Sequence, residues 1–269
     1  MKFGMPALVE CADIYECVKL CAECGLDFVE MNSSFPQYIP ETLDVDKLNE
    51  LKTKTGVFYT MHADEQMNPF DFNPSVSKCY FEEMRKTIRF GVAVGMPVIN
   101  LHLIKGVYVT LPEKVILLTD VYKEEYMKRV REFIAMCEEE VRGSNLKICI
   151  ENVDSNAFTS SQLEALELFM ASPAFGLTLD VGHEMCLGYK DSFVFDKYPK
   201  NLSHMHLHDC DGKKPHLALG DGIMNIKEKL AKLSENDTCV IEVKTIAGLK
   251  KSVEYLKKQQ NQTIMRGRI

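Results

Sequence analysis

The sequence predicts an α/β protein that forms one closed barrel of eight parallel strands, with a helix after each strand. Short apolar runs, typical of strands buried on both faces, alternate eight times with longer helix-like stretches. No linker or change of composition divides the 269 residues, an ordinary length for a single barrel of this kind. Six of the apolar runs lead directly into a histidine or an acid, which indicates an active site at one end of the sheet.

Each apolar run is expected to form one strand of the barrel. The eight expected strands are residues 3–9, 26–30, 57–61, 97–103, 146–150, 175–179, 202–207 and 239–243.

The helices are expected in the segments between and after these strands. They are residues 12–24, 44–54, 76–94, 120–141, 160–171, a short one near 191–198, then 224–233 and 246–258. The helix at 76–94 has start signals in Asn73 and Pro74 and a stop at Gly95, and Thr159 or Ser160 caps the helix at 160–171. We expect a single domain over residues 1–260 and a polar tail over 261–269.

The ten cysteines are not interpreted as disulfides or zinc ligands. Cys149, Cys186, Cys210 and Cys239 adjoin polar strand ends, where small buried apolar residues are favoured over reactive thiols. Cys17, Cys21 and Cys24 are spaced to share one helix face, and Cys21-x-x-Cys24 has no second pair at a zinc-finger spacing. This usage is typical of a reducing compartment, so a cytoplasmic location is expected.

The charge and the hydropathy pattern disfavour two other classes of protein. A formal net charge of −7 argues against a nucleic-acid-binding face, which would favour basic residues. The first residues lack the apolar segment of a signal peptide, and no uncharged apolar run reaches the roughly 18 residues that a membrane span needs.

Ionisable residues lie at or near the end of every expected strand, and active sites of such barrels lie at those ends. The eight residues are Glu10, Glu30, His62, His102, Glu151, Asp180, His206 and Glu242. Two alternatives stay open for Glu10 and Glu30: a role in the site, or an equally good structural role as loop residues or as acids near a helix N-terminus.

Four of these residues, from the last four strands, predict a divalent metal site. Three carboxylates and one imidazole suit Mn²⁺, Mg²⁺ or Co²⁺, and an imidazole also suits Zn²⁺. The alternative is an ion-pair cluster at the barrel mouth, although three carboxylates would repel one another without a metal. The four residues are Glu151, Asp180, His206 and Glu242.

Several motifs resemble the xylose isomerase-like barrel superfamily, which includes sugar-phosphate isomerases, epimerases and the endonuclease IV class of DNA-repair enzymes. They are TMHAD, IENVD, LDVGHEM, HMHLHDCDGKKPHLALGDG and VIEVK, and the similarity spans nearly the whole chain. The resemblance implies the same four metal ligands, and it implies that Glu151 and Glu242 serve as acid and base. It therefore implies a metal-dependent isomerase or epimerase of a small sugar or sugar phosphate, with a homo-oligomer as a possible state.

The resemblance also contains an alternative, an endonuclease with three zinc ions. Eight of nine zinc-ligand positions are kept in this sequence, and Lys214 stands where the ninth, an aspartate, would lie. The acids that follow His62 also disfavour DNA phosphates. The eight kept positions are His62, His102, Glu151, Asp180, His183, His206, His216 and Glu242.

Some of the same residues are candidates for other roles at the site. A second metal or the substrate could be bound by His62, His102, His183, His216 and Lys214, and an anionic group by Lys213, Lys214 or Lys244. A barrel that binds a ligand without catalysis is the second alternative, and the complete set of four metal ligands disfavours it.

Overall fold

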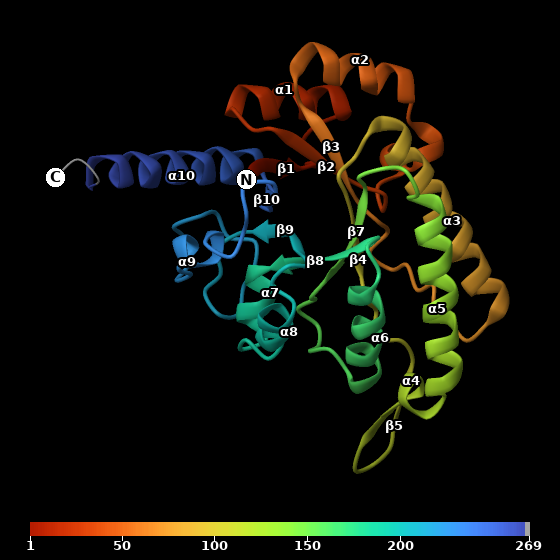
Figure 1. Cartoon of the computed structure of the whole chain (residues 1–269). Coiled ribbons are helices and arrows are strands. Elements are labelled where there is room, and N and C mark those ends of the chain that lie inside the picture. The colour runs from red at the N-terminus through yellow and green to blue at the C-terminus, as the bar shows by residue number, and fades with distance from the viewer. Residues whose placement is uncertain (267–269) are drawn as a thin grey trace.

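The computed structural model has the predicted architecture, a closed barrel of eight parallel strands (Figure 1). It describes the backbone of residues 1–266 and the side chains of residues 1–259. Around the barrel the order is β1-β10-β9-β8-β7-β4-β3-β2, so β1 and β2 close the ring. The strands are β1 (Lys2–Pro6), β2 (Phe28–Asn32), β3 (Phe58–His62), β4 (Val98–His102), β7 (Lys147–Glu151), β8 (Phe175–Asp180), β9 (Leu202–Leu207) and β10 (Thr238–Ile241).

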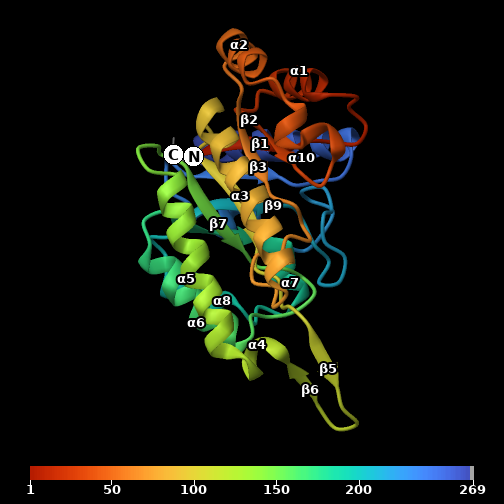
Figure 2. The same cartoon turned by 90° about the vertical axis from the view of Figure 1, so that its right-hand side faces the viewer.

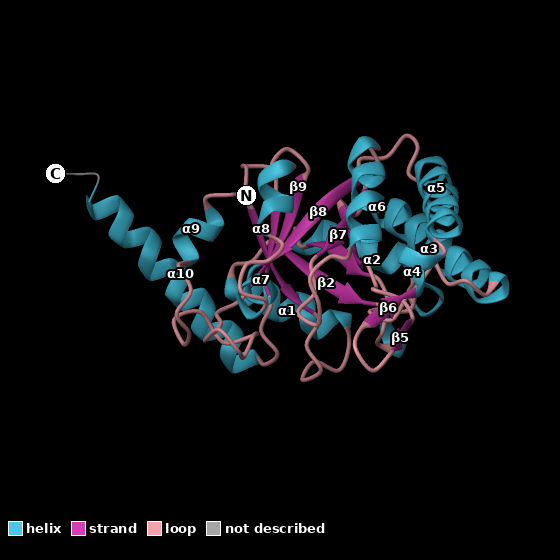
Figure 3. Ribbon diagram, turned by 90° about the horizontal axis from the view of Figure 1, so that it is seen from below, coloured by secondary structure: helices cyan, strands magenta, loops and turns pink. Residues whose placement is uncertain are grey.

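The helices lie outside the strands (Figure 3). The longer ones are α1 (Ile14–Cys24), α2 (Val45–Thr55), α3 (Pro74–Val94), α5 (Lys123–Glu140), α6 (Ser160–Ala171) and α10 (Ile246–Arg266). The short elements are η1 (Pro36–Tyr38), η2 (Pro40–Thr42), α4 (Leu118–Val121), α7 (Val181–Cys186), α8 (Ser192–Lys197) and α9 (Ile226–Leu230).

Local signals explain where these helices begin and end. Asn73 caps α3 through its side chain, Pro74 is the first helical residue, and Gly95 ends the helix with a left-handed φ of 68°. Thr159 and Gln162 form a capping box at the start of α6, as the expected cap at Thr159 or Ser160 requires. The capping signals of both helices are confirmed.

The core lies between the barrel and the helices and is rich in aromatic and sulfur-containing side chains. Phe133 of α5 packs near Phe175 of β8, and Phe169 of α6 contacts the same ring at 4.8 Å between ring centres. Cys17 and Cys21 are fully buried on one face of α1, which confirms that they pack as apolar residues.

Several segments differ from the expected elements, and α7, η1 and η2 were not predicted at all. The helix expected over 120–141 is broken at Tyr122, whose φ of −107° and ψ of 44° are not helical. The segment between β4 and α4 forms an unexpected antiparallel hairpin, β5 (Tyr108–Thr110) with β6 (Val115–Leu117), which extends beyond the barrel (Figure 2). Its sequence is too short for a periodicity signal, so it could not be told from a loop.

The predicted polar tail at the C-terminus lies outside the part of the chain whose side chains are described. The tail expected at 261–269 has no described side chains, and residues 267–269 are not described at all. Among the described residues, no helix is long and apolar enough to cross a membrane.

Candidate metal and catalytic site

The four predicted metal ligands meet at one end of the barrel, around a single ring nitrogen. His206 Nδ1 lies 3.0 Å from Glu151 Oε1, 3.2 Å from Glu242 Oε2 and 3.9 Å from Asp180 Oδ2. Glu151 and Asp180 are the last residues of β7 and β8, and Glu242 directly follows β10. Parallel strands of a barrel bring their carboxyl ends to the same rim, which is why residues 91 positions apart come together.

The chemistry of these donor atoms fits a divalent cation. Glu242 Oε2 is buried and accepts no hydrogen bond within the described structure, so a strong acceptor faces the centre of the group without a donor. Glu151 and Asp180 are almost completely buried. Three carboxylate groups at this spacing repel one another unless positive charge lies between them. Glu151, Asp180, His206 and Glu242 are the residues that would hold the ion.

The electrostatics of the group are dominated by imidazole–carboxylate pairs. Burial alone would raise the pKa of the Glu151 carboxyl, but His206 and His102 outweigh it and hold that pKa well below its usual value. Burial would likewise lower the pKa of the His206 imidazole, but Glu151 and Glu30 hold it well above its usual value. A divalent ion among these groups would take over the charge that the imidazole proton otherwise supplies.

His62 and His102 reach the same group through Glu151. Their Nε2 atoms lie 3.3 and 3.2 Å from Glu151 Oε2, and Asn100 also donates to that oxygen. His62 Nδ1 lies 2.7 Å from the carbonyl oxygen of Ala63 and donates to it. Burial would lower the pKa of this imidazole, but Glu151 outweighs it and raises the pKa to about 9, so Nε2 also carries a proton that it donates to the carboxylate. Both histidines therefore adjoin the proposed metal ligands from β3 and β4.

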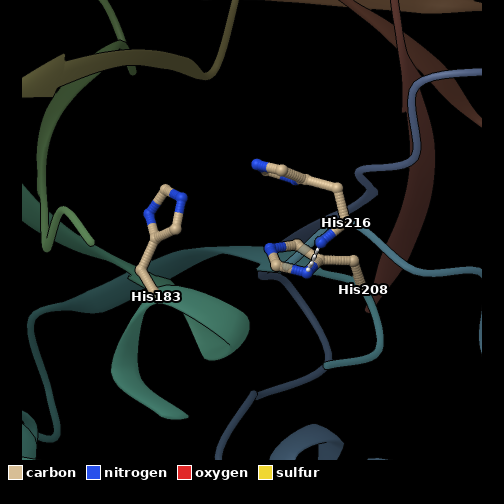
Figure 4. A group of neighbouring side chains, drawn as sticks. All are labelled: His183, His208 and His216. Carbon is tan, nitrogen blue, oxygen red and sulfur yellow. Dashed lines mark hydrogen bonds between the residues drawn. The ribbon is translucent and has the colours of Figure 1, made fainter. Parts of the chain in front are cut away.

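Three histidines form a second cluster beside Asp180: His183, His208 and His216 (Figure 4). Both ring nitrogens of His208 are engaged, because Nε2 lies 3.0 Å from Asp180 Oδ1 and Nδ1 accepts the backbone N–H of His216 at 2.7 Å. His183 and His216 instead use Nδ1 to donate to carbonyl oxygens, of Asn152 at 3.1 Å and of Glu242 at 3.3 Å. Their Nε2 atoms remain as acceptors, suited to a substrate hydroxyl or a second cation.

Glu30 adjoins the group of proposed ligands, and the sequence left its role ambiguous. Its interpretation as a loop or first-turn acid is wrong, because it lies inside β2 and is 3% exposed. The carboxylate accepts hydrogen bonds from Thr60 Oγ1 at 2.8 Å and His204 Nε2 at 2.9 Å, and it lies 2.8 Å from His206 Nε2. The sequence signal was the spacing of His204 and His206, which places both on one face of a strand.

Asp209 is a second residue whose role the sequence did not show. Its buried carboxylate accepts the backbone N–H groups of Cys210, Gly220 and Met224 at 2.8–3.0 Å. A Cβ on Gly222 would lie 2.2 Å from Asp209 Oδ1, so the loop closes on Asp209 only with glycine there. These contacts hold the loop that carries His216 over the site, which explains the H-x-H-D and G-D-G parts of the motif.

Glu10 and the lysines are placed differently from the strand-end residues. Glu10 is not at a strand end, because β1 ends at Pro6. Its side chain accepts the backbone N–H of Ile246 at the start of α10.

The three candidate lysines differ in their distance from the site. Lys244 Nζ lies 2.8 Å from Glu242 Oε1, so this lysine adjoins the site. Lys213 and Lys214 have exposed side chains, and their backbone N–H groups are bound by Asp211.

Two cavities open beside the four proposed ligands. The larger, of about 460 Å³, is lined by Glu65, Gln66, His102, Ile104, Lys105, Gly106, Tyr108, Val153, Asp154, Ser155, Asn156 and His183. The smaller, of about 120 Å³, includes Glu30, His62, Glu242 and Lys244. Most polar groups of the larger cavity can exchange hydrogen bonds with hydroxyl groups.

Comparison with known proteins agrees with this architecture. Residues 18–259 match the family model described as a xylose isomerase-like TIM barrel. No curated protein matches the sequence. Among solved structures, a D-tagatose 3-epimerase-like protein superimposes with a TM-score of 0.76 at 24% identity, with 99% of each chain covered. L-ribulose 3-epimerase gives 0.74 at 14% identity, covering 99% of this chain and 97% of its own.

A further solved structure, the IolI protein with a bound zinc atom, has a TM-score of 0.72 at 15% identity, with 99% of each chain covered. The TM-scores of these three structures show a shared fold. The match to the family model extends over most of the sequence, from within α1 into α10. The chain therefore belongs to the xylose isomerase-like TIM barrel family.

Proposed function

We propose that this protein is a divalent-metal-dependent isomerase or epimerase of a small sugar or sugar phosphate. The observation that carries the proposal is the position of Glu151 and Glu242, which approach His206 Nδ1 to 3.0 and 3.2 Å. They come from the two ends of the β7–β10 arc, the four neighbouring strands β7, β8, β9 and β10. Two carboxylates that approach one point from different strands can address two faces of a bound substrate.

The residues have separate tasks in the proposed reaction. When bound, a divalent ion would polarise a substrate carbonyl and make the neighbouring C–H more acidic. One glutamate removes the proton from that carbon, and the other returns a proton on the opposite face, which inverts the configuration. Return of the proton to the neighbouring carbon instead gives an aldose–ketose isomerisation. Asp180 and His206 complete the ligand set.

The remaining polar residues are proposed to bind and orient the substrate. His183 and His216 offer Nε2 acceptors fixed by their Nδ1 hydrogen bonds, and the larger cavity offers Asn156 and Asp154 to hydroxyl groups. A polyhydroxylated substrate suits such a lining better than an apolar one. Lys244 is the lysine that contacts a proposed ligand, so a negatively charged substrate group is proposed to bind there.

The comparisons support the same class of reaction. Similar solved structures include a D-tagatose 3-epimerase-like protein, L-ribulose 3-epimerase and a 3-keto-D-glucoside 4-epimerase, and the IolI protein contains zinc. All ten cysteines are free, which supports a cytoplasmic location.

The test is solvent exchange during turnover. The metal-loaded protein is incubated in D₂O with a panel of ketoses and aldoses, each with and without a phosphate. Deuterium is expected at the carbon next to the carbonyl of both substrate and product. Product that forms without any exchange would indicate a hydride shift and would contradict the two-glutamate mechanism. Efficient cleavage of abasic-site DNA, with no sugar turned over, would favour the endonuclease instead.

A further inference from the structure

His208 lies beside the proposed metal ligands, but the proposed reaction gives it no task. Its side chain is fully buried, as is that of Asp180. His208 follows His206 by two residues at the end of β9, so both side chains point to the same face. Nε2 of His208 lies 3.0 Å from Asp180 Oδ1 and 3.1 Å from Oδ2, nearly midway between the two carboxylate oxygens. The ring therefore meets a proposed ligand through one nitrogen.

The other ring nitrogen of His208 decides where the ring proton lies. The backbone N–H of His216 points at Nδ1 over 2.7 Å (Figure 4). A backbone N–H can only donate, so Nδ1 accepts and Nε2 carries the proton. Nδ1 also lies 3.2 Å from the carbonyl oxygen of Asp209, but a proton on Nδ1 for that longer contact would face the His216 N–H. His208 Nε2 is therefore a donor to Asp180.

This donor completes the hydrogen bonds that orient the Asp180 carboxylate. Asp180 caps α7, and its Oδ1 accepts the backbone N–H of His183 at 2.7 Å. Because His208 Nε2 lies between the two oxygens, donors fix the plane of the carboxylate from two directions. Oδ2 is then the oxygen that lies 3.9 Å from His206 Nδ1. Residues that orient a ligating side chain in this way commonly determine metal affinity.

The backbone on both sides is shaped around the His208 ring. A Cβ at Gly182 of α7 would lie 1.9 Å from His208 Cε1, so the ring packs against α7 only because residue 182 is glycine. His216 has a φ of 59°, a left-handed conformation that few non-glycine residues adopt. Backbone hydrogen bonds of 2.9 and 3.0 Å between Asp209 and Leu217 join the two ends of the loop that carries His216. This loop is therefore held where it aims one N–H at His208.

We propose that His208 is a positioning residue that couples the Asp180 carboxylate to the loop of residues 209–217, an inference that rests on the proposed metal site. Nε2–H holds the carboxylate in its orientation toward His206, and Nδ1 holds the loop through His216. Coupling between two sites is reciprocal. Metal held by Asp180 should therefore strengthen the contact between His208 and His216.

The first test measures the affinity of the full chain for Zn²⁺ by competition with a chromophoric chelator. His208→Leu removes the donor and should weaken the affinity by about 10–100-fold, the range typical of residues that orient a ligand. His208→Gln places an amide N–H near the position of Nε2 and should restore most of the affinity. His208→Asn is the matched variant. Its shorter side chain reaches only the position of Nδ1, so it can contact His216 but should lose affinity as His208→Leu does.

Hydrogen exchange followed by NMR measures the coupling to the loop. Saturating Zn²⁺ should slow the exchange of the His216 amide in the wild type and leave it unchanged in His208→Leu. The amide of Gly25, which ends α1, is the control and should exchange at the same rate with and without metal.

The outcomes separate this proposal from the metal site on which it rests. Wild-type affinity in His208→Leu or in His208→Asn would overturn the role of His208, and so would a His216 amide that does not respond to Zn²⁺. A wild type that binds none of Zn²⁺, Mn²⁺, Co²⁺ and Mg²⁺ would contradict both the metal site and this proposal.

Discussion

The two halves of the barrel rim contribute to the site in different ways. The β7–β10 arc supplies Glu151, Asp180, His206 and Glu242, whose donor atoms face a common point. The opposite half, β1–β4, supplies residues that contact those four: His62 and His102 lie beside Glu151, and Glu30 lies beside His206. The β7–β10 half therefore carries the proposed ligands, and the β1–β4 half carries residues that contact and orient those ligands.

This difference shows that a polar residue near a strand end does not by itself indicate direct participation in the reaction. Glu10 follows β1 but contacts the start of α10, far along the chain. The proposed division can be tested by substitutions in each half, which should differ in metal content, turnover and stability.

The largest effect is expected from removing a proposed ligand of the β7–β10 arc. The purified protein should hold about one divalent ion per chain, as expected for a single ligand set. His206→Ala and Glu242→Ala should each lose most of it, because either change leaves too few donors. Elemental analysis measures the ratio of metal to protein. Unchanged metal in both variants would contradict the four-ligand site.

The next largest effect is expected from neutralising the proposed acid and base. Glu151→Gln and Glu242→Gln should lower kcat by about 10²-fold or more, the usual result of losing a general acid–base group. Exchange of the substrate C–H in D₂O, followed by NMR, separates the two roles, since one variant should retain exchange of one epimer only. Glu132→Gln, which changes an exposed acid of α5 that lines neither cavity, is the control and should keep most of its turnover.

A smaller effect is expected from the supporting half. His62→Ala and His102→Ala should weaken metal affinity by about 10–100-fold, the range typical of residues that orient a ligand. Competition with a chromophoric chelator measures the affinity of each variant. If these substitutions instead remove a second ion, seen as a fall from about two ions per chain to one, the two halves would both hold metal.

The smallest effect is expected at Glu10. Glu10→Gln removes a negative charge from the N-terminus of α10, so the free energy of unfolding should fall by about 0.3–1 kcal/mol. Denaturant unfolding measures this change. Turnover and metal content should stay at the wild-type level, and a loss of either would place Glu10 in the site.

The sequence by itself determined the eight strand–helix units and the residues that the barrel brings together. Apolar runs and caps mark the elements locally, and parallel strands must carry their final residues to one rim, so Glu151, Asp180, His206 and Glu242 were predicted to converge. Their role as metal ligands and as acid and base stays a prediction.

Only the tertiary structure decided the surroundings of these four residues. A shift of one or two residues in a strand end moves a side chain between the lumen and the rim, and periodicity cannot resolve that shift. Glu30 was therefore ambiguous until barrel closure placed it beside His204. The contact of Glu10 with Ile246 spans almost the whole chain, and the engagement of His208 by Asp180 depends on two neighbouring strands meeting at the rim. Contacts between distant segments have no local sequence signal, because they are set by how the elements pack.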